Sequence, residues 1–360
     1  MRNTVWSALG VAFTLVSSPA VAGRTDRDAA SLARHAHVAL ASGKPALARA
    51  LMERAAAEGD AEALNSLATF VERGIGGEPD PEAALQLFER AAERGSVGAR
   101  LNLGLRLTIS ERSEDQRRAV EWLIDVHNNT PDPSVSEQTR SLAAAGLGVA
   151  FLLGRGVVAD VARGVDYLEE ADAQGSADER TLYLLGGAYQ RGWDVREPDA
   201  ARASRYFARA AAKGHGEAAW QIGLAHLRGQ GVEQNDALAY DWFVRACEAG
   251  DVRGDVSAAV LLAQGRGVVE DDSLARVLFE RAAERGSPHA LRGLGEMLVR
   301  GEGGAVDEAS GLAFLLLAAS AGVPVPRDVD ELAQDAQIRE RAERIAAEWL
   351  RAHPLAKAHP

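Results

Sequence analysis

The chain has 360 residues with a single cysteine, Cys247, which excludes disulfide-stapled scaffolds and multi-cysteine zinc modules. It carries 40 lysines and arginines against 52 aspartates and glutamates, and this acidic balance argues against nucleic-acid binding, which requires a basic surface to neutralise phosphates. With 47% hydrophobic and 26% charged residues, the composition is that of an ordinary globular protein.

The first 22 residues have the pattern of a signal peptide. Arg2 precedes an uncharged stretch from Val5 to Val16, and the small residues Ala20 and Ala22 fit the A-x-A cleavage rule. The uncharged stretch is shorter than the roughly 20 residues that a membrane-spanning helix needs, so an anchor is the weaker interpretation. We therefore expect cleavage near Ala22 and export, to the periplasm or outside the cell, without stable membrane insertion.

A short pattern then recurs along the chain. Four segments align, from Met52 to Ala63, Phe88 to Ala99, Phe207 to Ala218 and Phe279 to Ala290. Their shared glycine recurs, in most cases 36 residues apart, at Gly59, Gly95, Gly175, Gly214, Gly250, Gly286 and Gly322. A second glycine follows fifteen residues later at Gly74, Gly229, Gly265 and Gly301. Each repeat therefore consists of two segments separated by two glycine turns.

Both segments of a repeat have helical periodicity. Between Asp272 and Gly286, apolar or small side chains follow a 3.6-residue stripe, with charged residues on the other face. Candidate helix N-caps stand at regular places, namely Asp80, Asp160, Asp199, Asp236, Asp272, Asp307, Ser96, Ser176 and Ser287. We expect a helical-repeat region over residues 23–325 with one eroded copy near 96–132, a C-terminal capping helix over 326–353, and a tail from 354 to 360.

The repeat resembles that of the Sel-one-like repeat (SLR) family, relatives of the tetratricopeptide repeats. The copy that carries the resemblance most fully contains Ala218, Ile222-Gly223, His226, Gly229-Gln230-Gly231-Val232, Asp236, Trp242-Phe243, Ala246-Cys247 and Gly250. The resemblance covers roughly residues 26 to 350. It implies an all-α fold, a right-handed α/α superhelical solenoid of about eight helix-turn-helix repeats of ~36–40 residues with a C-terminal capping helix.

Most conspicuous residues fit the repeat without a chemical role. Cys247 stands where other copies have alanine, which favours a small buried packing residue over a nucleophile. His226 stands at a position that other copies fill with large apolar residues, so a core histidine is favoured over a ligand. His35 and His37 alternate along a helix and point apart, which disfavours a metal site. We expect no metal and no cofactor.

Catalytic motifs are also absent from the sequence. Some relatives of this family are associated with penicillin binding and hydrolysis, a chemistry that uses Ser-x-x-Lys in serine enzymes. Alanine or proline stands three residues before each of the lysines Lys44, Lys213 and Lys357. HExxH and GxSxG are missing as well. The sequence therefore favours a protein that is not an enzyme and has no small-molecule substrate.

Analogy with tetratricopeptide geometry predicts a binding face on the concave side, lined by the first helix of each hairpin. In one copy it places Glu62 and Asn65 there. Candidate partner-binding residues are Arg180, Tyr183, Glu217, Trp220, Leu224, Arg228, Arg253, His289, Arg292 and Glu296. Tyr183 and Trp220 are expected to be neighbours along the groove, and aromatic and arginine side chains are the usual anchors of binding. The alternative is that Trp220 only fills a gap between repeats.

Together these features predict an exported interaction scaffold or adaptor that binds a protein or peptide partner. Two alternatives remain open, a secreted factor that binds a host protein, and an enzyme or regulator of the cell wall. The identity of the partner does not follow from the sequence.

Overall fold

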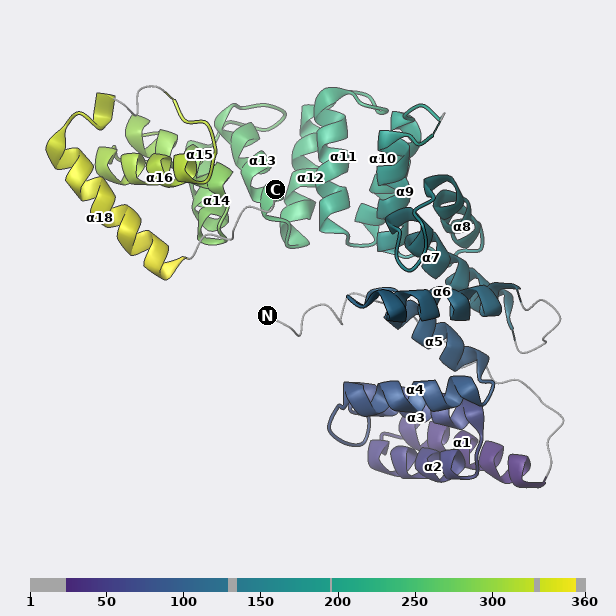
Figure 1. Cartoon of the computed structure of the whole chain (residues 1–360). Helices are drawn as coiled ribbons and strands as arrows, with labels where there is room; N and C mark the ends of the chain where they lie inside the picture. Colours follow the sequence, from purple (N-terminus) through teal and green to yellow (C-terminus); the bar gives the residue numbers. More distant parts are fainter. Residues whose placement is uncertain (1–23, 129–134, 195, 327–330, 354–360) are drawn as a thin grey trace. The chain divides into compact units, whose positions relative to one another are not determined.

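The computed structural model describes residues 24–128, 135–194, 196–326 and 331–353. The predicted signal peptide, residues 1–22, lies outside these ranges. Within them the chain is helical and forms no β-strand (Figure 1). No helix in the described ranges is long and apolar enough to cross a membrane.

The chain divides into two compact units. Unit 1 comprises the residues up to Leu185 together with 193–195, and unit 2 comprises residues 186–192 and those from Arg196 onward. In unit 1 the helices pack as consecutive pairs, α1 (Arg24–Ala41) with α2 (Pro45–Ala57), α3 (Ala61–Arg73) with α4 (Pro81–Glu93), α5 (Val97–Leu107) with α6 (Ser113–Asn128), and α7 (Glu137–Leu153) with α8 (Val161–Ala173).

Helix α9 (Glu179–Arg191) begins in unit 1 and ends in unit 2. Unit 2 continues with α10 (Ala200–Ala212), α11 (Gly216–Arg228), α12 (Asp236–Glu248), α13 (Val252–Ala263), α14 (Asp272–Glu284), α15 (Pro288–Arg300), α16 (Glu308–Ser320) and α18 (Ala336–Ala352). Each of these helices from α11 onward packs against the one before it, and α18 packs on α16 (Figure 1). The predicted succession of about eight hairpins and a final helix is confirmed.

Helix starts follow the predicted caps with three corrections. Asp80, Asp160, Asp199 and Asp307 each accept a hydrogen bond from a backbone N–H three residues on. At two other starts the cap lies one residue earlier than predicted, at Asn235 and at Asp271, because an Asn or Asp already stands there and the chain enters the helix sooner.

The third correction concerns Ser176, which does not cap a helix. After Gly175 the chain runs further before α9 begins at Glu179. Asp178 accepts the hydrogen bond of the Thr181 N–H at 2.7 Å and takes the capping role.

The Gly-x-Gly segments are turns that pack on the preceding hairpin. Gly231 has a φ of 72°, and a Cβ built on it would lie 2.1 Å from the carbonyl oxygen of Ala200 at the start of α10. Any side chain would therefore push the turn away from α10. This glycine serves close backbone approach and not phosphate binding.

Glycine is also required where it follows an apolar residue in a first helix, as in Ile222-Gly223. A Cβ on Gly223 of α11 would lie 2.6 Å from the ring of Phe243 on α12, and Phe243 is completely buried. The aromatic ring of one helix thus fills the space that glycine leaves on the other. This contact closes the hairpin and fixes the distance between its two helices.

The C-terminal helix begins later than the sequence suggests. Asp335 accepts hydrogen bonds from the N–H groups of Gln337 and Ile338, so α18 starts at Ala336. Its Trp349 packs edge-on against Phe314 of α16 at 4.9 Å between ring centroids. Helix α16 is apolar on nearly all sides, and α18 covers one of them.

Candidate protein-binding face

The first helices of the hairpins in unit 2, α11, α13 and α15, present one continuous set of side chains. Equivalent positions lie 36 residues apart, as for Leu224, Val260 and Glu296. We call the exposed side of these three helices the first-helix face of unit 2. It contains eight of the ten predicted partner-binding residues and the partly exposed Ser257 and Val260.

Trp220 joins α11 to α13. Its indole N–H donates a hydrogen bond of 3.0 Å to the hydroxyl of Ser257, and the guanidinium of Arg253 lies 4.3 Å from the centre of its ring. Arg253 in turn pairs with Glu217 at 3.1 Å and with Asp251 at 2.6 Å. The predicted residues Glu217, Trp220 and Arg253 are therefore brought together in one cluster.

This cluster gives Trp220 a structural role without burying it completely. The polar edge of the indole is satisfied inside the protein, whereas part of the ring remains exposed. Arg253 has its charge balanced by two carboxylates and is less available to a partner than the sequence suggested. Trp220 fills the space between hairpins and also contributes to the surface.

Beyond Trp220 the face is apolar. Leu224 is half-buried and packs with Trp220 against the core around Leu261. Val260, one repeat further along, is 38% exposed. Arg228 follows at the end of α11 and is exposed. A short apolar strip thus ends next to a positive charge.

On α15 the face becomes charged. Arg292 donates a hydrogen bond of 2.7 Å to Glu296, one turn further along the helix. His289 is exposed in the first turn. These three predicted residues share the face with Leu224 and Val260, but Arg292 and Glu296 satisfy each other.

The remaining two predicted residues, Arg180 and Tyr183, lie on α9 and belong to unit 1. Both are partly buried. Since Trp220 belongs to unit 2, the expected proximity of Tyr183 to Trp220 stays a prediction.

In unit 1 the first helices α3 and α5 are joined by polar groups. The side-chain amide of Asn102 donates a hydrogen bond of 2.9 Å to that of Asn65, and Asn102 is 5% exposed. Glu62 is bonded to Asn65 and Ser96, and burial raises the pKa of its carboxyl group. Arg106 pairs with Glu72 and covers the ring of Phe88 at 4.5 Å. The sequence analysis predicted Glu62 and Asn65 for the concave side, which stays a prediction, and did not identify Asn102, which lies in the eroded copy.

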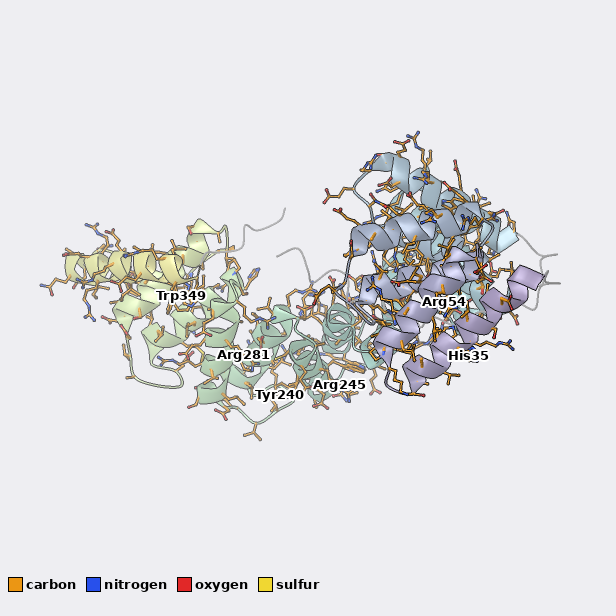
Figure 2. All side chains as sticks on the ribbon, turned by 90° about the horizontal axis from the view of Figure 1, so that it is seen from below. His35, Arg54, Tyr240, Arg245, Arg281 and Trp349 are labelled. Carbon is orange, nitrogen blue, oxygen red and sulfur yellow. The ribbon has the colours of Figure 1, made fainter. Side chains whose placement is uncertain are left out.

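Cys247 has a different environment from the one predicted. It is only partly buried, and its thiol donates a 2.8 Å hydrogen bond to the completely buried carboxylate of Asp255 on α13. Arg281 of α14, labelled in Figure 2, also binds Asp255, through Nε at 2.9 Å, and Arg285 directly after α14 binds it at 3.1 Å. Burial and the bond to Asp255 raise the pKa of the Cys247 thiol to about 11, which disfavours a nucleophilic role.

The histidines have structural surroundings. His226 is half-buried, and its Nδ1 lies 3.2 Å from the carbonyl oxygen of Glu233 in the following turn. Burial lowers the pKa of His37 on α1. Across the described ranges, no group of three or more His, Cys, Asp or Glu side chains is close enough to hold a metal ion.

Comparison with known proteins agrees with this architecture. The model of the Sel1 repeat matches seven segments that cover more than half of the chain, residues 42–60, 61–96, 141–176, 180–215, 216–251, 256–287 and 288–323. The unmatched stretch from 97 to 140 contains α5 and α6, which keep the hairpin despite the eroded sequence. No curated protein sequence matches the chain.

Two solved structures are similar in fold. The first is c5321, a protective antigen of uropathogenic Escherichia coli with an SLR fold, which matches 90% of this chain and 77% of its own with a TM-score of 0.59 and 18% identity. The second is a Sel1 repeat protein from Oxalobacter formigenes, which matches 66% of this chain and 96% of its own with a TM-score of 0.52 and 21% identity. Repeat matches and fold agree, and the chain belongs to the Sel1 repeat family, whose helical solenoids are protein-interaction scaffolds.

Proposed function

We propose that the chain is an exported, non-enzymatic scaffold that binds an extended segment of a protein partner on the first-helix face of unit 2. The observation that carries the proposal is the partly exposed strip of Trp220, Leu224 and Val260, bordered by Arg228. An apolar strip next to an unburied arginine suits a segment with apolar side chains and a carboxylate.

The internal bonds of this face support the proposal. The hydrogen bond to Ser257 and the stacked Arg253 hold the Trp220 ring in one orientation before any partner arrives. A side chain that is already ordered loses less conformational entropy on binding, which favours affinity. A helix-borne face also keeps its spacing, since each hairpin packs on the next.

The test is affinity capture from an envelope extract with the mature chain and two matched variants. Val260→Asp places a charge on the proposed face, where Val260 is 38% exposed, and Leu274→Asp places one on the second helix α14, where Leu274 is 41% exposed. We expect Val260→Asp to weaken capture at least about tenfold, because a buried unpaired carboxylate at an interface costs more than ~1.4 kcal/mol.

Leu274→Asp should capture the partner as the parent does. Both variants must melt within a few degrees of the parent, which checks that the hairpins remain packed. Equal capture by the parent and Val260→Asp, or loss only with Leu274→Asp, would show that another surface binds the partner.

A further inference from the structure

Helix α10 differs in charge from every other second helix of a hairpin. Its sequence, AARASRYFARAAA, contains three arginines and no acidic residue, whereas the sequences of α2, α4, α6, α8, α12, α14 and α16 each include Asp or Glu. This occurs in a chain with a formal net charge of −12. The local excess of positive charge is therefore a specific feature of this helix.

The basic residues lie on one side of α10. Arg202, Arg205, Arg209 and Lys213 are all exposed, and at 100° per residue they fall within about 80° of one another around the helix axis. We call these four residues the α10 basic stripe. With a rise of 1.5 Å per residue, the stripe is about 16 Å long.

Tyr189 and Tyr206 hold two arginines of the stripe in place. The guanidinium of Arg202 lies 5.2 Å from the ring centre of Tyr189 and donates a 2.9 Å hydrogen bond to its hydroxyl. The ring of Tyr189 stacks on that of Tyr206 at 5.7 Å, and Arg209 lies 5.7 Å from the ring centre of Tyr206. Stacking on an aromatic ring holds an arginine guanidinium in a fixed orientation, whereas a lysine ammonium lies at the end of a flexible chain.

The equivalent positions of the next two repeats show how unusual this is. Where α10 has Arg205, α12 has Asp241 and α14 has Val277, each 36 residues further on. Where it has Arg202, those helices have the exposed Leu238 and Leu274. Arg209 has basic equivalents in both repeats, Arg245 (Figure 2) and Arg281, and Lys213 has one, Arg285. The hairpin itself therefore does not require the charges at 202 and 205.

We propose that the α10 basic stripe is a second interaction surface, which binds a carboxylate-rich segment of a protein partner. The spacing of the stripe matches carboxylates at positions i, i+3, i+7 and i+11 of a helix laid along α10. Guanidinium groups bind carboxylates in a bidentate manner. Arg205 is more available than Arg202, because Arg202 also pairs with Asp199 at 3.5 Å. The acidic character of the remaining chain disfavours a polyphosphate such as nucleic acid.

The experiment uses the mature chain and a fluorescein-labelled peptide of alanine and glutamate, with glutamates at i, i+3, i+7 and i+11. Binding is measured by fluorescence anisotropy at low ionic strength. We expect saturable binding by the parent and a loss of about tenfold or more for Arg205→Glu, because like charges then face each other. Arg205→Gln, which only removes the charge, should lose less.

The matched control is Arg245→Glu on α12, which makes the same charge change at an exposed arginine stacked on Trp242 at 4.6 Å. It should bind the peptide like the parent. Binding is compared only among variants that have the same melting temperature as the parent.

Several outcomes would overturn the proposal. These are absence of saturable binding by the parent, equal losses with Arg205→Glu and Arg245→Glu, and stronger Arg205-dependent binding to phosphatidylglycerol vesicles or duplex DNA than to the peptide. Self-association of the parent that Arg205→Glu abolishes would assign the stripe to a second copy of the chain instead. None of these outcomes depends on Val260, so the result is distinguishable from the test of the first-helix face.

Discussion

Two junctions between first helices, one in each unit, occupy the same register and use different chemistry. In unit 1 the amide of Asn102 bonds that of Asn65, and in unit 2 the indole of Trp220 bonds the hydroxyl of Ser257, each pair 37 residues apart. The unit 1 junction is polar and buried at Asn102, whereas the unit 2 junction leaves part of an aromatic ring exposed. The same repeat position therefore contributes only to packing in unit 1, whereas in unit 2 it contributes both to packing and to the exposed surface.

A third junction is ionic, and breaking it should have the largest effect. Asp255→Ala removes a completely buried carboxylate that binds Cys247, Arg281 and Arg285. We expect a loss of about 2–3 kcal/mol in the free energy of unfolding, less than the ~3–5 typical of a broken buried pair, because both arginines are half-exposed and regain water. Denaturant-induced unfolding of the variant and the parent measures this difference in the free energy of unfolding.

The control for this prediction is Asp255→Leu. The equivalent residue of α15 is Leu291, which is completely buried, so leucine suits this position in a neighbouring hairpin. It should lose less stability than the alanine variant. A larger loss with leucine would show that the ionic bonds are essential to this junction and that packing does not replace them.

Trp220→Ala tests the exposed junction. It removes a half-buried ring and the bond to Ser257, and we expect a loss of about 2 kcal/mol, below the ~3–5 of a fully buried aromatic. Trp220→Phe keeps the ring and loses only the hydrogen bond, so it should cost about 1 kcal/mol. If Trp220→Ala unfolds at the parent's denaturant concentration, the ring does not hold the hairpins together.

Asn102→Ala tests the buried polar junction. It leaves the amide of Asn65 without its partner, for an expected loss of about 1 kcal/mol. The double variant with Asn65→Ala should cost less than the sum of the two single variants, since the two amides act as a pair. Strict additivity in this cycle would contradict a direct coupling between α3 and α5.

Cys247→Ala should have the smallest effect, under about 1 kcal/mol, because the other copies have alanine at this place. The thiol is held protonated: its pKa is about 11 in the folded chain, against an ordinary value of 9.0. The stabilising contribution of this raised pKa is complete below about pH 9 and is lost as the pH rises towards 11.

The alkylation rate of Cys247 by iodoacetamide checks this pKa. At pH 8 the folded chain should react much more slowly than the denatured chain, and Asp255→Asn should speed the reaction. A folded-state rate equal to that of the denatured chain would show that the thiol is not restrained.

Much of the fold could be predicted because its determinants are local. Glycines with positive φ, such as Gly95 and Gly250, end the second helices, and side-chain caps such as Asp80 and Ser96 start α4 and α5. The one-residue errors at Asn235 and Asp271 arise where two candidate caps are adjacent. Only the geometry of the turn decides between them.

The site was less predictable because it depends on pairs in different repeats. Asp255 stands where other copies have Leu291 or Ala219, and nothing near it in sequence indicates that Arg281 and Arg285 bind it. Similarly, the analogy with tetratricopeptide geometry predicted Trp220 for the binding face but could not reveal its bond to Ser257. Side-chain pairing between hairpins depends on the superhelical register, which local periodicity does not specify.

The most direct test of the first-helix face is site-specific photo-cross-linking. A photo-reactive amino acid replaces Val260 in one sample and Leu274 in another, and each is irradiated with the captured partner. Because the two residues have similar exposure, 38% and 41%, accessibility alone does not distinguish them. We expect a cross-link to the partner from position 260 and none from position 274. A cross-link from position 274 alone would contradict this expectation.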